Sequence, residues 1–247
     1  MADRSPGTGR TAFGTERAGL VAFGRRMVAD GLVDGMSGNL SVRAADSGLV
    51  AITPSGVSYD DIEPADICLV RLTDGSTDSP LRPSTETPMH LAIYRATDAR
   101  AVVHTHSPFV VALSAVLDVL PAVHYAMADL GGPVRVAPYA RFGTEQLARN
   151  AVAALADRTA VILQNHGALS YGRTLGQAYD RARTLEWLAR TYWHARLAAG
   201  GGTLRLLDQA ALDEVREAAR AIGYGEAKPP PLPTTPQTPP AAPAPPG

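Results

Sequence analysis

Three histidines of this chain have a spacing that could hold one metal ion. His104 and His106 stand at the end of a short run with adjacent valines, residues 101–104, which predicts a strand. Residues i and i+2 of a strand point to the same face, so both imidazoles can reach one ion. His166 follows a second apolar run, residues 159–163, and precedes a glycine. Three protein ligands with an open fourth position are typical of a catalytic zinc site.

The same histidines could instead be structural. A His-x-His pair often lies in a core or on a surface, where imidazoles hydrogen-bond under a sheet. The chain has six histidines and one cysteine, Cys68, so neither an internal disulfide nor a cysteine-rich structural zinc site is available. Cys68 lies in an apolar run and is expected to be packed. Spacing alone leaves both interpretations of the histidines open.

One carboxylate and three loops could complete a site. Glu86 directly precedes a predicted helix, where it could be a general acid or base, or only a favourable charge at a helix N-terminus. The loops 36–39, 53–56 and 82–86 contain small hydrogen-bonding residues. Backbone N–H groups and hydroxyls in such loops can hold a phosphate without a large net charge. Each loop by itself is equally consistent with an ordinary turn.

Composition argues against several classes of function. The chain has 247 residues, 45% of them hydrophobic, and a formal net charge of −1, so it carries no positive patch that would suggest nucleic acid as a partner. No apolar run approaches the roughly 18 residues that span a membrane. The N-terminus lacks the apolar segment of a secretory signal. We therefore expect a cytoplasmic protein with neither a nucleic-acid nor a membrane partner.

Periodicity predicts a single α/β domain over residues 13–227, with a central mixed, largely antiparallel sheet flanked by helices. The expected helices are 16–30, 87–95, 109–117, 144–156, 175–197 and 210–222. The expected strands are 39–43, 49–53, 67–72, 101–104, 132–136 and 160–163. Residues 1–12 and the Pro-rich tail 228–247 are expected to be disordered, the tail being either a solvated extension or a polyproline-type ligand.

The motifs at residues 37–43, 52–57, 82–86, 102–106, 121–125, 137–144 and 164–167 resemble those of the class II aldolase/adducin family, in that family's order and spacing. The resemblance is greatest to L-fuculose-1-phosphate aldolases and covers residues 16–224. It implies that a zinc ion is held by His104, His106 and His166, with Glu86 as the catalytic acid/base. It also implies a C4 homotetramer whose active sites lie at the subunit interfaces.

Further roles come from the same resemblance. A phosphate pocket is implied for Gly38, Asn39, Ser55, Gly56, Ser84 and Thr85. Tyr125 matches a tyrosine that transfers a proton at the aldehyde-side oxygen, and Tyr224 looks like a C-terminal tyrosine that reaches a neighbouring subunit's site. Tyr139, Arg141 and Phe142 could shape the aldehyde end. The other histidines, His90, His124 and His194, are expected to have structural roles only.

The implied reaction is the zinc-dependent, reversible cleavage of a ketose 1-phosphate, similar to L-fuculose 1-phosphate, into dihydroxyacetone phosphate and an aldehyde such as L-lactaldehyde. A 5-deoxyribulose-1-phosphate aldolase and a methylthioribulose-1-phosphate dehydratase on the same scaffold are alternatives. Manganese, iron or cobalt would also suit imidazole ligands. A different class, an adducin-like interaction module without catalysis, predicts loss of the three histidines and Glu86, and all four are present.

Overall fold

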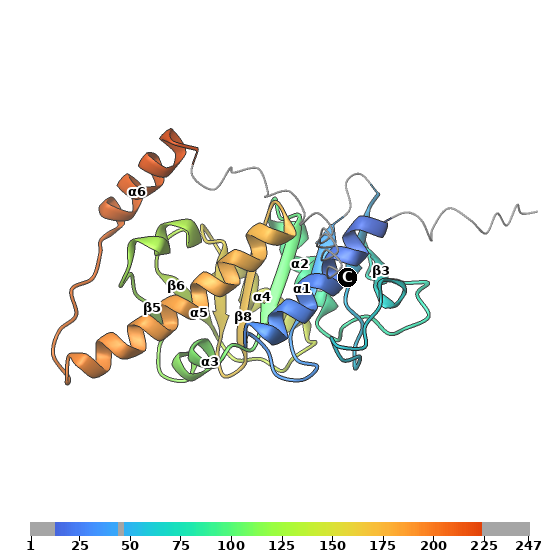
Figure 1. The fold of residues 1–247 in the computed structure, drawn as a ribbon, viewed down its shortest axis with the longest axis horizontal. Helices are drawn as coiled ribbons and strands as arrows, with labels where there is room; N and C mark the ends of the chain where they lie inside the picture. Colours follow the sequence, from blue (N-terminus) through green and yellow to red (C-terminus); the bar gives the residue numbers. More distant parts are fainter. Residues whose placement is uncertain (1–12, 44–46, 224–247) are drawn as a thin grey trace, which may run out of the picture.

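A computed structural model describes residues 13–43 and 47–223 (Figure 1). The expectations for residues 1–12, for the tail 228–247 and for Tyr224 lie outside the described residues, so they stay predictions. No helix within the described ranges is both long enough and apolar enough to cross a membrane.

An eight-stranded sheet forms the centre of the fold, in the order β3-β2-β1-β4-β8-β7-β6-β5 (Figure 1). All neighbouring strands are antiparallel except β6 and β7, which are parallel. The strands are β1 Asn39–Arg43, β2 Leu49–Ile52, β3 Cys68–Arg71, β4 Ala101–Thr105, β5 Val119–Leu120, β6 Val134–Ala137, β7 Ala160–Leu163 and β8 Gly167–Gly172. The predicted mixed, largely antiparallel sheet is confirmed.

Helices cover both faces of the sheet (Figure 1). The α-helices are α1 Gly14–Ala29, α2 Thr87–Ala96, α3 Pro108–Ser114, α4 Glu145–Ala154, α5 Leu175–Ala198 and α6 Gln209–Ala221, and the 3-10 helices are η1 Pro64–Asp66 and η2 Tyr125–Leu130. One core packs α2 and α4 against the sheet, and two others pack α1, α3 and α5 against it. The sequence predicts one apolar face on the long helix α5, formed by Leu175, Ala178, Ala182, Leu185 and Leu188, and the structure buries all of these except Leu175, which is half-buried.

Strand alternation determines which residues reach the helix α2. On β1 and β4, Leu40 and Val103 are paired and belong to the core beneath α1 and α5. Their neighbours Asn39 and His104 are also paired, and they point to the opposite face because successive side chains of a strand alternate. Polar residues of both strands therefore lie on the sheet face covered by α2.

Most predicted elements agree with the structure to within two residues, but the end of α3 differs, and β8, the two-residue strand β5 and the 3-10 helices η1 and η2 were not predicted. The helix predicted to reach residue 117 ends at Ser114, whose hydroxyl donates to the Val111 carbonyl and accepts from the Asn165 N–H. The strand β8 was missed because it begins and ends with glycine and contains no β-branched residue. Pairing with β4 on one side and β7 on the other makes it a strand.

Candidate active site

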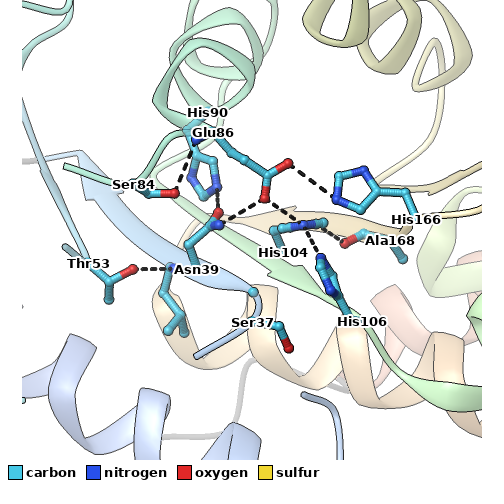
Figure 2. Close-up of polar contacts among 12 residues, drawn as sticks. Ser37, Asn39, Thr53, Ser84, Glu86, His90, His104, His106, His166 and Ala168 are labelled. Carbon is cyan, nitrogen blue, oxygen red and sulfur yellow. Dashed lines mark hydrogen bonds and ion pairs between the residues drawn. The ribbon is translucent and has the colours of Figure 1, made fainter. Parts of the chain in front are cut away.

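Four side chains converge at one end of the strands β4 and β7 (Figure 2). Glu86 is the N-cap residue of α2, His104 belongs to β4, and His106 lies just beyond the end of that strand. His166 lies in the turn between β7 and β8. Each of the four offers a possible metal-ligand atom, and these atoms all lie within 4.8 Å of one another. The predicted histidine triad and Glu86 are therefore brought together.

The turn that carries His166 depends on its neighbours. Asn165 has a positive φ of 53°, a conformation that asparagine tolerates better than most residues. A Cβ on Gly167 would overlap the Thr105 carbonyl oxygen, so only glycine allows β8 to approach β4 this closely. These two local requirements direct His166 toward His104 and His106 at the end of β4.

The hydrogen bonds of His104 determine which of its ring nitrogens faces the site. Its Nδ1 lies 2.8 Å from the Ala168 carbonyl oxygen, which can only accept, so Nδ1–H is the donor. Its Nε2 lies 2.9 Å from Oε2 of Glu86 and 3.0 Å from Nε2 of His106. A backbone carbonyl that orients the far nitrogen of a histidine is a usual feature of metal sites.

The proximity of these groups changes their protonation. Burial disfavours the charge on Glu86, but the His104 and His166 rings beside it hold the pKa of its carboxyl well below its usual range. Burial would lower the pKa of His104, but the adjacent Glu86 carboxylate raises it above 6.5. Burial together with the other histidines lowers the pKa of His106 to about 3 and that of His166 to about 4. Two of the three imidazoles therefore stay neutral, as metal ligands must.

The donor set fits a divalent transition metal. His104 and His106 direct ring nitrogens toward the same point, and Oε1 of Glu86 is buried 3.4 Å from Nε2 of His166, with no hydrogen-bond partner in the part of the chain that the structure describes. Imidazole nitrogens with one carboxylate suit zinc, manganese, iron or cobalt. Within the described residues, the three histidines would hold such an ion, and the Glu86 carboxylate lies directly beside it.

A cleft of about 320 Å³ opens beside these four residues. All six residues of the predicted phosphate pocket line it, together with Glu86, His106 and His166. Tyr139 and Phe142 line it too, whereas Arg141 does not. No Lys or Arg is among the described residues that line the cleft, so an anion there would depend on hydroxyls, N–H groups and the N-terminus of α2.

The predicted catalytic residue Tyr125 is not among the described residues that line this cleft. The Tyr125 side chain is 58% exposed and packs beside His124. Tyr224 lies outside the described residues.

One group of polar residues was missed by sequence reasoning. His90, expected to have a structural role only, is fully buried and hydrogen-bonded to Asn39 and Ser41. Ser41 is also bonded to Tyr94. A signal was present, because Glu86, His90 and Tyr94 are spaced four apart, as on one helix face, and Asn39 and Ser41 are spaced two apart, as on one strand face.

A sequence model of the Class II Aldolase and Adducin N-terminal domain matches residues 18–193. The chain belongs to this class II aldolase and adducin family. Its resemblance to the family, predicted from motifs, is thereby confirmed.

This class II aldolase family member is also similar to individual named proteins and solved structures. A Bacillus thuringiensis protein named 5-deoxy-D-ribulose 1-phosphate aldolase is 38% identical over 85% of this chain and 97% of its own length. A Rhodospirillum rubrum protein named 5-methylthioribulose-1-phosphate/5-deoxyribulose-1-phosphate aldolase is 42% identical over 72% of this chain and 80% of its own. A solved structure titled L-fuculose 1-phosphate aldolase is 34% identical, has a TM-score of 0.79, and is matched over 84% of this chain and 97% of that one. These relatives confirm the predicted enzyme class, a class II aldolase.

Proposed function

We propose that this chain is a metal-dependent aldolase that reversibly cleaves a ketose 1-phosphate to dihydroxyacetone phosphate and a short aldehyde. The observation that carries the proposal is the state of the Glu86 carboxylate. Its Oε2 accepts from the Asn39 amide at 3.0 Å and lies 2.9 Å from His104 Nε2, while Oε1 is buried beside His166 with no hydrogen-bond partner among the described residues. A carboxylate with one oxygen held and one free is suited to transfer a proton at a defined point.

Glu86 serves as the acid/base at carbon C3 of the ketose in this proposal. In the direction of synthesis, its carboxylate removes a proton from C3 of dihydroxyacetone phosphate, and the resulting electron pair forms the C3–C4 bond. In the direction of cleavage, that bond breaks and the proton returns from Glu86 to C3. The lowered pKa of Glu86 favours the carboxylate form that synthesis requires. When bound by the three histidines, a divalent metal such as zinc would supply Lewis-acid stabilisation of negative charge on the substrate oxygens.

Ser84 and Ser55 would bind the phosphate in this proposal. The Ser84 hydroxyl oxygen accepts from the Glu86 N–H at 3.2 Å, and its own O–H is left to donate to a phosphate oxygen. Ser55, Gly56 and Thr85 line the same cleft. Binding energy from the phosphate, which does not react, would be available to position the reacting carbons.

Tyr125 is proposed as the group that takes the proton from the C4 hydroxyl during cleavage. Because it is exposed and does not line the cleft of its own chain within the described residues, it would act in the cleft of a neighbouring subunit. This supports retaining the predicted homotetramer with interfacial sites as part of the proposal. Tyr224 is kept as a second candidate from a neighbouring subunit.

Among substrates, we rank 5-deoxy-D-ribulose 1-phosphate first and L-fuculose 1-phosphate second. The relatives named for the first substrate are 38% and 42% identical over 85% and 72% of this chain, whereas an Escherichia coli protein named L-fuculose phosphate aldolase is 38% identical over 66% of it. The side chains of Met36, Tyr139 and Phe142 also favour acetaldehyde over L-lactaldehyde, which carries an additional hydroxyl, because they line the cleft with apolar surface. Cleavage of 5-deoxyribulose 1-phosphate would release acetaldehyde.

The test is an assay of purified, zinc-loaded protein for release of dihydroxyacetone phosphate from 5-deoxyribulose, L-fuculose and methylthioribulose 1-phosphates. An EDTA-treated sample and a Glu86→Gln variant are the controls. Release that both controls abolish supports the proposal, and the relative kcat/KM values rank the aldehydes. Loss of water from methylthioribulose 1-phosphate without carbon–carbon cleavage would indicate the dehydratase instead. Bound metal with no turnover of any sugar phosphate would contradict an aldolase.

A further inference from the structure

A continuous series of buried, hydrogen-bonded polar groups leads from the core to Glu86, and Figure 2 shows its part from His90 through Asn39 to Glu86. His90 Nε2 lies 2.6 Å from Oδ1 of Asn39, and Asn39 Nδ2 lies 3.0 Å from Oε2 of Glu86. On the other side of the imidazole, His90 Nδ1 lies 2.7 Å from the Ser41 hydroxyl, which lies 2.8 Å from the Tyr94 hydroxyl. All five residues are buried, so water does not compete for these bonds.

The carboxylate at the end of this chain determines the direction of every hydrogen bond. Ionised Glu86 can only accept, so the Asn39 amide nitrogen must donate to it and the Asn39 oxygen must face His90. That oxygen can only accept, so His90 Nε2 carries a proton. In a neutral imidazole Nδ1 is then an acceptor, Ser41 donates to it, and Tyr94 donates to Ser41. The lowered pKa of His90, about 3 because of burial and the nearby His104, agrees with a neutral ring.

We propose that His90 is a positioning residue for the acid/base Glu86, acting through the side-chain amide of Asn39; the proposal rests on the aldolase function above. His90 holds the amide in the one orientation that aims its N–H groups at Oε2. With Oε2 bound by the Asn39 amide, Oε1 is the oxygen left for proton transfer. Neither ring nitrogen of His90 is exposed to the cleft, so the residue touches no substrate.

Loss of the positioning role of His90 and loss of the predicted phosphate contact of Asn39 should change different kinetic constants. Loss of a phosphate contact raises KM, because that contact is present in the bound substrate and in the transition state alike. Loosening of Glu86 lowers kcat, because the position of the proton-transfer oxygen matters only in the reaction itself. Because His90 does not line the cleft, substitutions at His90 test the positioning of Glu86 without removing a phosphate contact.

The experiment compares His90→Leu, His90→Gln and Ile93→Val with the wild-type enzyme. Leucine removes the donor to Asn39, whereas the glutamine amide can supply a donor where Nε2 stood. Ile93 is fully buried on the same helix, and its aliphatic side chain makes no hydrogen bond to these polar groups, so Ile93→Val controls for a general loss of stability. We expect His90→Leu to lower kcat about 10- to 100-fold. We further expect KM within about twofold of wild type, unchanged metal content, and partial recovery of kcat in His90→Gln.

A kcat for His90→Leu within about twofold of wild type would overturn the proposal, as would an equal loss of kcat in Ile93→Val. If His90→Leu does not fold, Ser41→Ala decides, because it removes only the hydroxyl that donates to Nδ1. A several-fold lower kcat with unchanged KM supports the proposal, and an unchanged kcat overturns it.

The tautomer of His90 is measurable even if the enzyme turns over none of the sugar phosphates. Long-range ¹H–¹⁵N correlation spectra of the wild-type protein at neutral pH should show a neutral ring protonated on Nε2, with a mixture of tautomers in Asn39→Leu. A ring protonated on Nδ1 would overturn the hydrogen-bond chain whatever the substrate. Absence of turnover with the expected tautomer would instead locate the failure in the proposed function.

Discussion

The Nε2 atom of His104 lies 2.9 Å from Oε2 of Glu86, and both side chains are almost completely removed from solvent. This ion-pair geometry links the predicted metal ligand on β4 to the predicted acid/base at the start of α2. The role of the carboxylate charge can therefore be tested separately from the presence of the metal.

Glu86→Gln replaces the carboxylate by an amide of nearly equal size. We expect kcat to fall by about 10² to 10⁴, because the amide cannot exchange a proton with C3. We expect zinc to be retained, because the three histidines are unchanged. Turnover of 5-deoxyribulose 1-phosphate and metal content by mass spectrometry check both outcomes, and near-normal turnover would contradict the assignment of Glu86.

His106→Ala removes one of the three imidazoles. We expect both metal and activity to be lost, because two histidines and a carboxylate that already accepts other hydrogen bonds hold a divalent ion poorly. Thermal unfolding of the wild-type protein with and without added zinc provides the reference, since a metal that binds only the folded state raises the midpoint. A variant that binds zinc as tightly as wild type would exclude His106 as a ligand.

Ser55→Ala tests the phosphate loops without disturbing Glu86. The Ser55 backbone N–H is bonded to the Arg82 carbonyl, and this bond survives the substitution. We expect KM to rise about 10- to 100-fold with little change in kcat, because a hydrogen bond to a charged group contributes about 1.5–3 kcal/mol. Ser58→Ala, in the same loop region but outside the cleft lining, is the matched control. Equal KM values for the two variants would remove Ser55 from the phosphate site.

Mixing of two inactive variants tests whether Tyr125 acts across a subunit interface. Tyr125→Phe and Glu86→Gln should each be inactive alone, while mixed oligomers would contain some clefts with an intact Glu86 from one subunit and an intact Tyr125 from the next. In a head-to-tail ring of randomly mixed subunits, each of the two intact residues is present at a cleft about half of the time. Activity would therefore return to about a quarter of the clefts. Refolding the variants together and assaying the product checks this. No recovery in a mixed oligomer of confirmed composition would mean that Tyr125 does not act in trans.

The lowered pKa of His90 predicts how the free energy of unfolding depends on pH. Its pKa is about 3 in the folded chain against 6.5 for an ordinary histidine, so between these values the unfolded state binds more protons and stability falls as the pH falls. His90→Gln lacks this proton uptake. The stability difference between wild type and His90→Gln should therefore shrink by about 2 kcal/mol from pH 7.5 to pH 5.

Urea unfolding at several pH values between 7.5 and 5 measures this difference. His104, His106 and His166 are present in both proteins, so the comparison isolates His90. A difference that stays constant with pH would show that His90 is not held neutral in the folded state.

Local sequence patterns were sufficient for the part of the site that local geometry controls. His104 and His106 share a face because they are two residues apart at a strand end, and Glu86 begins a helix because Pro88 follows it. The three loops with small hydrogen-bonding residues were also identifiable, since each adjoins a predicted strand or helix. The resemblance to a known family then supplied roles that spacing alone had left open.

Other features depended on contacts between distant parts of the chain. The strand β8 forms because β4 and β7 pair with it on both sides, which its glycine-rich sequence does not indicate. The position of Tyr125 outside the cleft also follows from how η2 packs, because exposure is a property of the folded surface.

The hydrogen bond between Asn39 and His90 shows most clearly what the sequence determines and what only the tertiary structure decides. The sequence by itself determined that Asn39 and Ser41 share one strand face and that Glu86, His90 and Tyr94 share one helix face, because the periods of strand and helix are local. Only the tertiary structure decided that these two faces meet, because that depends on β1 pairing with β4 and on α2 packing across them. The contact spans 51 positions of the chain, so no local pattern records it.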